Sequence, residues 1–521
     1  MAAQQLINSI SALFSKSFKD FTQSAQSPYF AAIDLGSNSF HMLIVKVNDD
    51  SIEIVDRVKE MVQIARGLQR SKSLSEDAKA RALHALSCFQ ERIRDIPHHQ
   101  IRVVGTKALR MASDANAFLQ EAEAALQHPI DIISGYEEAR LVYLGASQDI
   151  SPDKGKPLII DIGGGSTEFI IGEDNNPRIL ESLSIGCVTF SDRFLSDDNG
   201  DAITEITPEI LNEIYYATSI ELELIIRRYR KIGWDITVGS SGTMRAVAEL
   251  MPGDVVSGVI TKDGLAALRQ HLIDNTPIDN IESISERRRS VLPAGILILS
   301  AIFDQLDLDE IIVVDATLKE GLIYDTIGRL SSEDMRDNTV EKLIDTYSID
   351  REQADRVDNT LIHFLPSLEQ DPIINGLDVK KLTHWAALLH EIGLTISHSG
   401  YHHHGYYILS ESDMAGFSRS EQEVLALYVG CHRRKINTER SNLLTADNAS
   451  ALATLLVLLR LAVLLNHRRE ETIERPTLVI DGATVSLQFD ENWLDEHPLT
   501  YRKLLQEQRY LAAIDVELSF S

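Results

Sequence analysis

The chain is poor in cysteine and has no long apolar run. Its 521 residues include only three cysteines, Cys88, Cys187 and Cys431, which lie far apart. This spacing excludes a disulfide framework and the paired cysteines of a zinc site. No apolar stretch reaches the length of a membrane span, and the first 27 residues contain no uninterrupted apolar core of secretory length. These absences favour a folded cytoplasmic protein.

Positive charge is also scarce. The chain has 50 Lys and Arg residues against 78 Asp and Glu residues, which gives a formal net charge of −28 at pH 7. Such a charge repels polyanions, and the basic residues are not interleaved with aromatic ones, so we expect no nucleic-acid partner. The short basic clusters are either solvated surface segments or local attractors for an anionic substrate; they lie at 227–231, 287–289, 432–435 and 467–469.

The first 27 residues place apolar side chains at helical spacing, among them Leu6, Ile10 and Phe14. A helix on a membrane surface, a helix packed against the body and a frayed terminus all fit this pattern. Weak peripheral association of residues 1–27 with the inner face of a membrane therefore stays open.

The length of the chain exceeds what one hydrophobic core supports. Strand-like and helical patterns alternate from about 28 to 326, which indicates an α/β fold, and the pattern becomes helical from about 327 until a break at Pro476. The predicted strands are 101–104, 130–133, 158–160, 236–238 and 311–314, and the predicted helices are 115–126, 211–228, 294–303, 340–347, 351–365, 380–391, 420–429 and 451–465. We expect an extension (1–27), two similar α/β domains facing across a cleft (28–141 and 142–326), a helical domain (327–475) and a small α/β domain (476–521).

Two segments, 31–45 and 158–172, share one pattern: an apolar strand, an Asp at its end, a Gly/Ser turn and a second apolar strand. Turns of this composition also occur in ordinary β-hairpins. The repetition favours a duplicated phosphate clamp, because glycine lets backbone N–H groups approach an anion and a carboxylate holds a cation such as Mg²⁺. A dinucleotide fingerprint is excluded, since a strand follows where a helix is required. The corresponding residues are Asp34 and Asp161, Gly36 and Gly163, and Ser39 and Ser166; Ser37, Asn38, Gly164, Gly165 and Thr167 complete the predicted phosphate-binding turns.

Acidic residues follow both the strand at 130–133 and the second turn. Ser134 and Glu137 have the spacing of a capping box, which leaves Glu138 free to act as a general base on water. Complementing the helix dipole is the alternative role of Glu138. Glu168 occupies the position that His41 has in the first copy. It is either a residue that orients water or holds metal, or a solvent-facing strand residue.

Two further strand-to-helix turns carry polar residues. In the first, Thr106 and Lys107 lie where a helix N-terminus favours an anion, and Arg110 follows one turn later, where its guanidinium suits a phosphate. In the second, Ser241, Gly242 and Thr243 form a Gly/Ser-rich turn. An ordinary capped turn explains either segment, but the composition of the second favours ligand contact.

The ordered motifs IDLGSNS, GTKALR, ISGxEEAR, IDIGGGSTE and GSSGT resemble the exopolyphosphatase/guanosine pentaphosphate phosphatase family over about 28–475. The resemblance implies the actin, sugar-kinase and chaperone-ATPase fold, that is, two ribonuclease-H-like domains. It also implies Mg²⁺-assisted release of orthophosphate from an anhydride chain, and a homodimer. By this likeness Glu138 corresponds to the catalytic base, and Asp34, Asp161 and Glu168 correspond to acids that organise metal and water.

The helical region contains His384, His390-Glu391, His398 and 402–404, and it resembles the HD metal-phosphohydrolases. The Glu391 in place of the usual Asp argues against metal activity there, because the change alters reach and geometry. A surface for a long anionic chain suits these histidines better.

The complete glycine turn 163–165 and the segment 398–404 are more similar to the exopolyphosphatase branch. The sequence therefore predicts hydrolysis of inorganic polyphosphate, with guanosine pentaphosphate (pppGpp) as the alternative substrate. A kinase of the same superfamily and a non-enzymatic, nucleotide-gated binding protein are the remoter alternatives.

Overall fold

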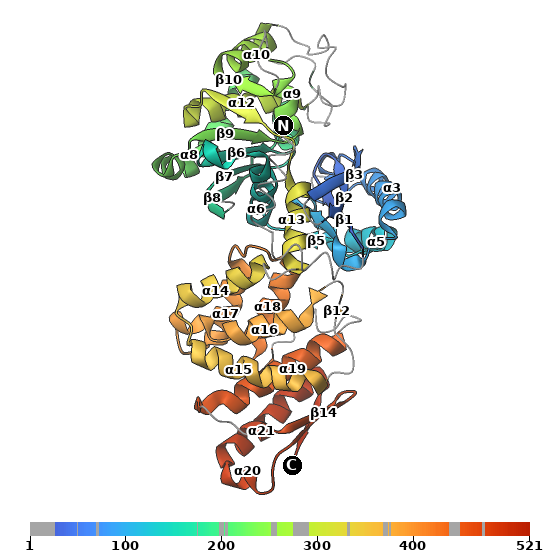
Figure 1. The fold of residues 1–521 in the computed structure, drawn as a ribbon, viewed down its shortest axis with the longest axis vertical. Coiled ribbons are helices and arrows are strands. Elements are labelled where there is room, and N and C mark those ends of the chain that lie inside the picture. The colour runs from blue at the N-terminus through green and yellow to red at the C-terminus, as the bar shows by residue number, and fades with distance from the viewer. Residues whose placement is uncertain are drawn as a thin grey trace. The chain divides into compact units, whose positions relative to one another are not determined.

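The computed structural model describes residues 27–48, 51–68, 72–173, 176–196, 203, 207–251, 258–274, 291–330, 334–367, 373–374, 377–436, 449–470 and 475–521. The chain divides into two compact units, residues 1–335 and 336–521. Figure 1 colours the first unit from blue to yellow and the second from yellow to red.

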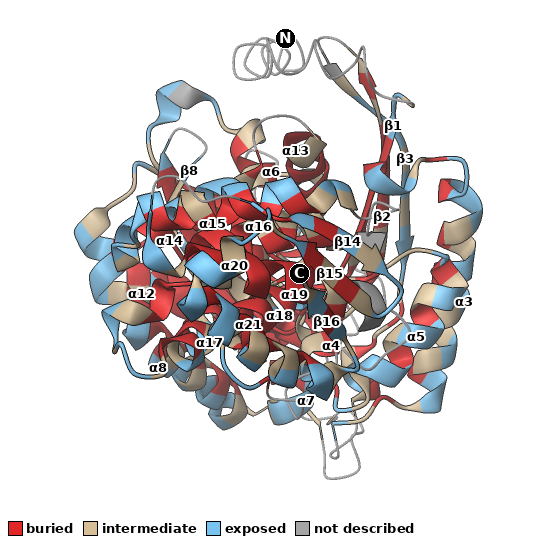
Figure 2. Ribbon diagram, turned by 90° about the horizontal axis from the view of Figure 1, so that it is seen from below, coloured by how far each residue is buried: buried red, intermediate tan, exposed pale blue. Residues whose placement is uncertain are grey.

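The first sheet of the first unit has the strand order β3-β2-β1-β4-β5. Its antiparallel part precedes a parallel part, in which β4 lies beside β1. Helix α3 begins at Glu76 because the Ser75 side chain accepts a hydrogen bond from the Ala78 N–H. Buried and exposed residues alternate along this helix, as Figure 2 shows. The elements are β1 (Tyr29–Leu35), β2 (Phe40–Asn48), β3 (Ser51–Glu60), α3 (Glu76–Ile93), β4 (Ile101–Gly105), α4 (Lys107–Met111), α5 (Ala115–Leu126) and β5 (Asp131–Ile132).

The second sheet has the strand order β10-β11-β9-β6-β7-β8 and repeats the plan of the first. Again an antiparallel hairpin is followed by a parallel neighbour, here β9 beside β6. The elements are β6 (Pro157–Ile162), β7 (Thr167–Glu173), β8 (Asn176–Leu183), α7 (Cys187–Phe194), α8 (Pro208–Ile232), β9 (Ile236–Ser240), α9 (Gly242–Ala248), β10 (Val259–Thr261), α10 (Lys262–Asp274), α12 (Leu292–Leu306) and β11 (Glu310–Val313).

Two further helices, α6 (Gly135–Ala146) and α13 (Leu318–Leu330), cross at two glycines. A Cβ on Gly321 would lie 1.9 Å from the Leu141 carbonyl oxygen, and one on Gly145 would lie 2.3 Å from the Thr317 carbonyl oxygen. The Arg140 side chain on α6 also pairs with Asp325 on α13 at 2.5 Å. Backbone contact and a buried ion pair therefore hold these helices together.

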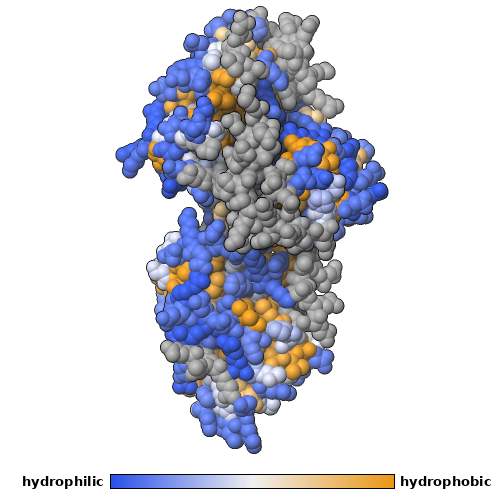
Figure 3. Space-filling model, viewed as in Figure 1, coloured by the Kyte–Doolittle hydropathy of each residue, from blue (hydrophilic) through white to orange (hydrophobic). Residues whose placement is uncertain are grey.

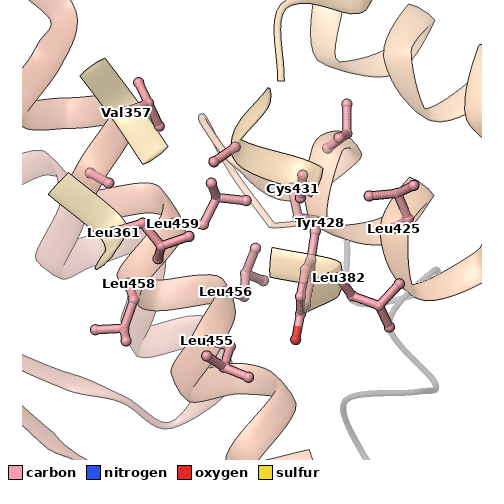
Figure 4. Packing of buried hydrophobic residues seen from close by; sticks show 14 of the residues in the cluster. Val357, Leu361, Leu382, Leu425, Tyr428, Cys431, Leu455, Leu456, Leu458 and Leu459 are labelled. Carbon is pink, nitrogen blue, oxygen red and sulfur yellow. The ribbon is translucent and has the colours of Figure 1, made fainter. Parts of the chain in front are cut away.

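The second unit is mainly helical and ends in the three-stranded sheet β14-β15-β16. Leucines of α19 pack between α15 on one side and Leu382 and Tyr428 on the other (Figure 4). The elements are α14 (Met335–Tyr347), α15 (Arg351–Phe364), β12 (Ile373–Ile374), β13 (Leu377–Asp378), α16 (Val379–Leu389), α17 (Tyr401–Glu411), α18 (Arg419–Cys431), α19 (Ala449–Leu465), β14 (Thr477–Asp481), β15 (Thr484–Gln488), α20 (Trp493–Glu496), α21 (Pro498–Leu511) and β16 (Glu517–Phe520).

Hydrophilic residues cover most of the described surface on the face shown in Figure 3. Within the described ranges, no helix has the length and apolar character needed to cross a membrane.

The predicted α/β class is confirmed, and every predicted strand and helix coincides with an observed element. The largest differences lie at the ends of elements: the strand expected at 130–133 is reduced to Asp131–Ile132, and the helix expected to reach Glu391 ends at Leu389. The five-part domain division stays a prediction. The expected N-terminal helix falls on residues 1–26, which lie outside the described residues.

Candidate active site

The two predicted phosphate turns are hairpin turns with the same strand register. In the first hairpin, Asp34 on β1 is opposite His41 on β2. In the second, Asp161 on β6 is opposite Glu168 on β7. The correspondence read from the sequence is therefore a structural one. The difference between the copies, histidine against glutamate, falls at one equivalent position.

The two turns approach each other closely. A Cβ on Gly164 would lie 3.2 Å from the Ser37 Cβ, and one on Gly165 would lie 3.1 Å from the Ser37 Oγ. The Lys107 Nζ donates a hydrogen bond of 2.9 Å to the Gly165 carbonyl oxygen. Within the first turn, a Cβ on Gly36 would lie 2.9 Å from the Ser39 carbonyl oxygen. A side chain at Gly36 would therefore force the first turn to shift, and side chains at Gly164 or Gly165 would crowd Ser37.

A pocket of about 180 Å³ lies at these turns. One water needs about 10–15 Å³, so the pocket has room for a chain of phosphates. It is lined by most of the predicted site residues: Asp34, Gly36, Ser37, Asn38, Ser39, Glu138, Asp161, Gly163, Gly164, Gly165, Ser166, Glu168, Ser241, Gly242 and Thr243.

Two predicted phosphate ligands are not among the lining residues, and the structure shows why. Thr167 is fully buried, and its hydroxyl donates a 2.6 Å hydrogen bond to the Ile185 carbonyl oxygen. Neighbouring strand residues point to opposite faces, so Thr167 points away from the pocket into which Glu168 points. Arg110 instead donates to the Ile133 carbonyl oxygen and to the Glu138 carboxylate, the latter at 3.4 Å.

Four carboxyl groups line the pocket: Asp161 and Glu168 are buried, and Asp34 and Glu138 are partly buried. Burial, and next the Glu138 carboxylate, raises the pKa of Asp34 to about 8. Burial raises the pKa of Asp161 to about 6, against a hydrogen bond from Ser240. Burial also raises the pKa of Glu138. It raises the pKa of Glu168 well above its ordinary value, and the Glu138 and Asp161 carboxylates raise that pKa further. The free pocket therefore favours a proton or a cation beside its acids.

Glu138 lies in the first turn of α6, and the turn before it sets its position. The Ser134 side chain accepts a hydrogen bond from the Glu137 N–H at 3.1 Å, which is the serine half of the predicted capping box. The Glu137 carboxylate accepts two hydrogen bonds from Arg140, at 2.7 and 2.8 Å. Glu137 thus has a structural role, while Glu138 lines the pocket.

The residues of the pocket fit a hard cation. Asp34 Oδ1 is buried and has no hydrogen-bond partner. Across the described part of the chain, no group of three or more His, Cys, Asp or Glu side chains forms a metal cage. Mg²⁺ is usually held by one or two carboxylates and completed by water and substrate phosphates, so an incomplete set of protein ligands suits it.

The turn before α9 is strained. Ser241 has a φ of +112°, outside the region that L-residues prefer, and its hydroxyl caps α9 by accepting from the Met244 N–H. Such strain is concentrated at functional sites. The expectation that this turn contacts ligand matches its place in the pocket.

Sequence reasoning did not single out several lining residues, among them Lys59, Arg245, Thr317 and Lys319. Arg245 pairs with Asp315 at 3.0 Å. Lys319 lies in the first turn of α13, where a cation opposes the helix dipole. That unfavourable placement is the signal that marks it in the sequence.

Within the described residues, the histidines of the helical unit are not part of any group of three or more side chains that could hold a metal ion. The buried His390 ring donates a hydrogen bond from Nδ1 to the Ala387 carbonyl oxygen, and the buried His432 ring does the same to the Val429 carbonyl oxygen. Burial lowers the pKa of both rings. These histidines are therefore neutral in the folded unit near pH 7, and the anionic-chain surface predicted for them stays a prediction.

Comparison with known proteins defines the class. The Ppx/GppA phosphatase family matches residues 43–330, and domain III of Ppx/GppA phosphatases matches residues 335–508. The guanosine-5'-triphosphate,3'-diphosphate pyrophosphatase of Vibrio vulnificus is 37% identical over 491 residues, covering 93% of this chain and 96% of the relative. The enzyme of that name from Pseudoalteromonas atlantica is 35% identical over 487 residues, covering 92% and 94%.

Two solved structures share the fold of more than half of the chain. An exopolyphosphatase from Cytophaga hutchinsonii has a TM-score of 0.52 at 24% identity and covers 58% of this chain and 98% of its own. An exopolyphosphatase-like protein has a TM-score of 0.53 at 24% identity and covers 59% and 99%.

The chain is an acid-anhydride hydrolase by class. It belongs to the Ppx/GppA phosphatase family, which confirms the resemblance. The prediction of the exopolyphosphatase branch is wrong, because relatives along almost the whole chain are named for the guanosine substrate. The branch prediction depended on the glycine turn 163–165 and the segment 398–404; a turn predicted to bind phosphate does not separate the branches, because both substrates contain phosphate groups.

Proposed function

We propose that this chain acts on guanosine 5′-triphosphate 3′-diphosphate. It hydrolyses the terminal phosphoanhydride bond of the 5′-triphosphate and releases orthophosphate. The observation that carries the proposal is the 37% identity over 93% of the chain to a relative named for that substrate. The pocket supports it, because its turns offer backbone N–H groups to phosphate and its acids are suited to water and metal.

In the proposed reaction, water attacks the terminal phosphorus and the bond to the bridging oxygen breaks. Glu138 accepts the proton of the water, and the electrons of the broken bond stay on the departing nucleotide. Phosphoryl transfer of this kind depends on positioning and charge more than on a protein nucleophile. The turns 36–39, 163–166 and 241–243 hold the phosphates.

We further propose that Asp34 and Asp161 hold Mg²⁺, with Glu168 orienting the water or joining the metal. When bound, the cation offsets phosphate charge and polarises the phosphoryl oxygens. The unpartnered Asp34 Oδ1 supports this assignment. Ser182 donates a 2.8 Å hydrogen bond to Glu168, which limits the rotation of that carboxylate.

The duplicated hairpins support a finer interpretation of the fold. We propose that the two sheets are two actin-like domains and that the helical unit is an HD-like domain followed by the small sheet. The homodimer that the family resemblance implies stays a prediction, which sedimentation of the full chain tests.

The function is tested by assaying the full chain with guanosine 5′-triphosphate 3′-diphosphate and Mg²⁺, without any phosphate acceptor. We expect orthophosphate release with a kcat/KM at least about tenfold above that for inorganic polyphosphate, equivalent to about 1.4 kcal/mol of transition-state binding. Equal or faster cleavage of polyphosphate would contradict the proposal. A requirement for an acceptor would instead identify a kinase.

A further inference from the structure

Lys319 occupies a position that is unfavourable for a lysine. It is the second residue of α13, and a cation near a helix N-terminus opposes the helix dipole. Its residue is 8% exposed, so the ammonium has lost most of its contact with bulk water. It nevertheless lines the phosphate pocket. A residue that departs from local preferences in a pocket points to a function.

The contacts of the ammonium leave part of its binding capacity free. Nζ donates to the Thr317 Oγ1 at 2.9 Å and to the Glu320 Oε2 at 3.1 Å. An ammonium has three protons, so one is left for a further acceptor.

The Glu320 carboxylate has other partners besides Lys319. Its Oε2 also accepts the Thr317 N–H at 2.8 Å, and its Oε1 pairs with Arg57 at 3.2 Å. One carboxylate therefore serves a backbone donor and two cations. The positive charge of Lys319 is only partly balanced by it.

Lys319 acts on both hairpin motifs. Its charge opposes the rise in pKa that burial causes at Asp34, and it does the same at Asp161. These aspartates are the equivalent residues of the two turns, so the ammonium lies close to both. Lys319, Asp34 and Asp161 line the same pocket, so a phosphate held between the turns shares that pocket with the ammonium.

The backbone beneath Lys319 is fixed. The Thr317 carbonyl oxygen lies against Gly145 of α6, and Gly321 lies against the Leu141 carbonyl oxygen. Helix α6 also carries Glu138. The cation and the proposed base therefore belong to one packed pair of helices, which is the pre-organisation that phosphoryl transfer needs.

We propose that Lys319 is a substrate-binding residue whose ammonium contacts the phosphate chain directly. The inference rests on the proposed function to the extent that a phosphoanhydride chain occupies the pocket. On binding, the free proton of Nζ donates to a phosphate oxygen, and the charge offsets part of the repulsion between the substrate and the four carboxyl groups.

Equilibrium binding of inorganic tripolyphosphate, in Mg²⁺ and in a Glu138→Gln background that slows hydrolysis, tests this contact. Lys319→Gln removes the charge and keeps a hydrogen-bond donor, and we expect about 10- to 100-fold weaker binding. Lys319→Arg keeps the charge and should bind within a few-fold of the parent. In enzyme that keeps Glu138, Lys319→Gln should lower kcat/KM by a similar factor. Lys319→Arg should keep most of the parental kcat/KM.

Arg57→Met is the matched control, because it removes the other cation from Glu320 and Arg57 is not a pocket-lining residue. We expect it to leave tripolyphosphate binding unchanged. Parental affinity in Lys319→Gln, or equal losses in Lys319→Gln and Arg57→Met, would overturn the inference, as would absence of binding to the parent. Failure of the proposed function is seen separately, as poor cleavage of guanosine 5′-triphosphate 3′-diphosphate by the unmodified chain.

Discussion

The Arg110 guanidinium on α4 lies 3.4 Å from the Glu138 carboxylate on α6. Both side chains are mostly buried, with exposed fractions of 18% and 12%, so the pair is only partly screened by solvent. Burial raises the pKa of Glu138, while the Arg110 charge lowers it. Arg110 thus favours the deprotonated form of Glu138, in which the proposed base can accept a proton from water.

Glu138→Gln should lower kcat by about 10²- to 10⁴-fold, because an amide cannot accept the proton of the attacking water. The KM should change far less, since Gln keeps the size and polarity of the side chain. Steady-state phosphate release measures both constants. Glu173→Gln, at an exposed position of β7, is the control and should match the parent. Retention of the full rate in Glu138→Gln would disprove the assignment of the base.

Arg110→Met should move the acidic limb of the kcat/KM profile to higher pH. The sign follows because a base acts when deprotonated, so the rate rises with pH through the pKa of Glu138. Loss of the Arg110 charge removes an influence that lowers this pKa. The measurement is kcat/KM from pH 5 to 9. An unmoved or acid-shifted limb would show that Arg110 does not act on the base.

Mg²⁺ removal should abolish phosphate release, and added Mg²⁺ should restore it. Asp34→Asn should raise the Mg²⁺ concentration for half-maximal rate by at least about tenfold, because the loss of one carboxylate from a site with few protein ligands weakens it strongly. Titration of activity with Mg²⁺ after chelation checks this. Asp95→Asn, which removes an exposed carboxylate that does not line the pocket, should leave that concentration unchanged.

The local parts of the site could be predicted from the sequence, because Asp, Gly and Ser at fixed offsets specify a turn by themselves. The side chain of Thr167 lies outside the pocket lining, which the sequence did not show because turn composition does not reveal where strand alternation begins. Arg140 and Asp325, 185 positions apart, could not be paired, since only the packing of α6 on α13 brings them together. Lys319 was missed although its place in the first turn of α13 opposes the helix dipole, because only the fold shows that this turn lines the pocket. The substrate could not be chosen, since the turns are predicted to bind phosphate, a group that both substrates have in common.

The buried ion network between α6 and α13 should be essential for stability. Asp325 pairs with Arg140 at 2.5 Å, with Arg329 at 2.9 Å and with Arg102 at 3.3 Å. Asp325→Asn removes the buried carboxylate that these three guanidinium groups share and should cost about 3–5 kcal/mol of unfolding free energy. Urea unfolding measures the loss. Asp307→Asn, from an exposed pair with Lys262, should change it by less than about 1 kcal/mol.

The helix crossing makes an unusual prediction about glycine. Ala normally stabilises a helix interior over Gly by about 1 kcal/mol. Gly321→Ala should do the opposite, since its Cβ would lie 1.9 Å from the Leu141 carbonyl oxygen and the helices must separate. We expect the free energy of unfolding to fall by about 1–3 kcal/mol, as is typical of overpacking. We also expect a lower kcat, because Glu138 and Lys319 move apart with their helices. A more stable variant would show that the crossing tolerates a side chain.

The histidines of the helical unit should make its stability depend on pH. Burial lowers the pKa of His432 well below its ordinary value near 6.5, with His390 as the next cause, and burial lowers the pKa of His402 to about 4. Below pH 6.5 the unfolded chain takes up protons that the folded unit does not, so stability must fall as the pH falls. Each histidine contributes at most about 1.4 kcal/mol per pH unit. Urea unfolding at pH 7.5 and 5.5 should show this fall, and His432→Phe should reduce it. His363→Asn, at an exposed position of α15, should leave it unchanged. Equal slopes in all three proteins would mean that protonation of His432 is not coupled to unfolding.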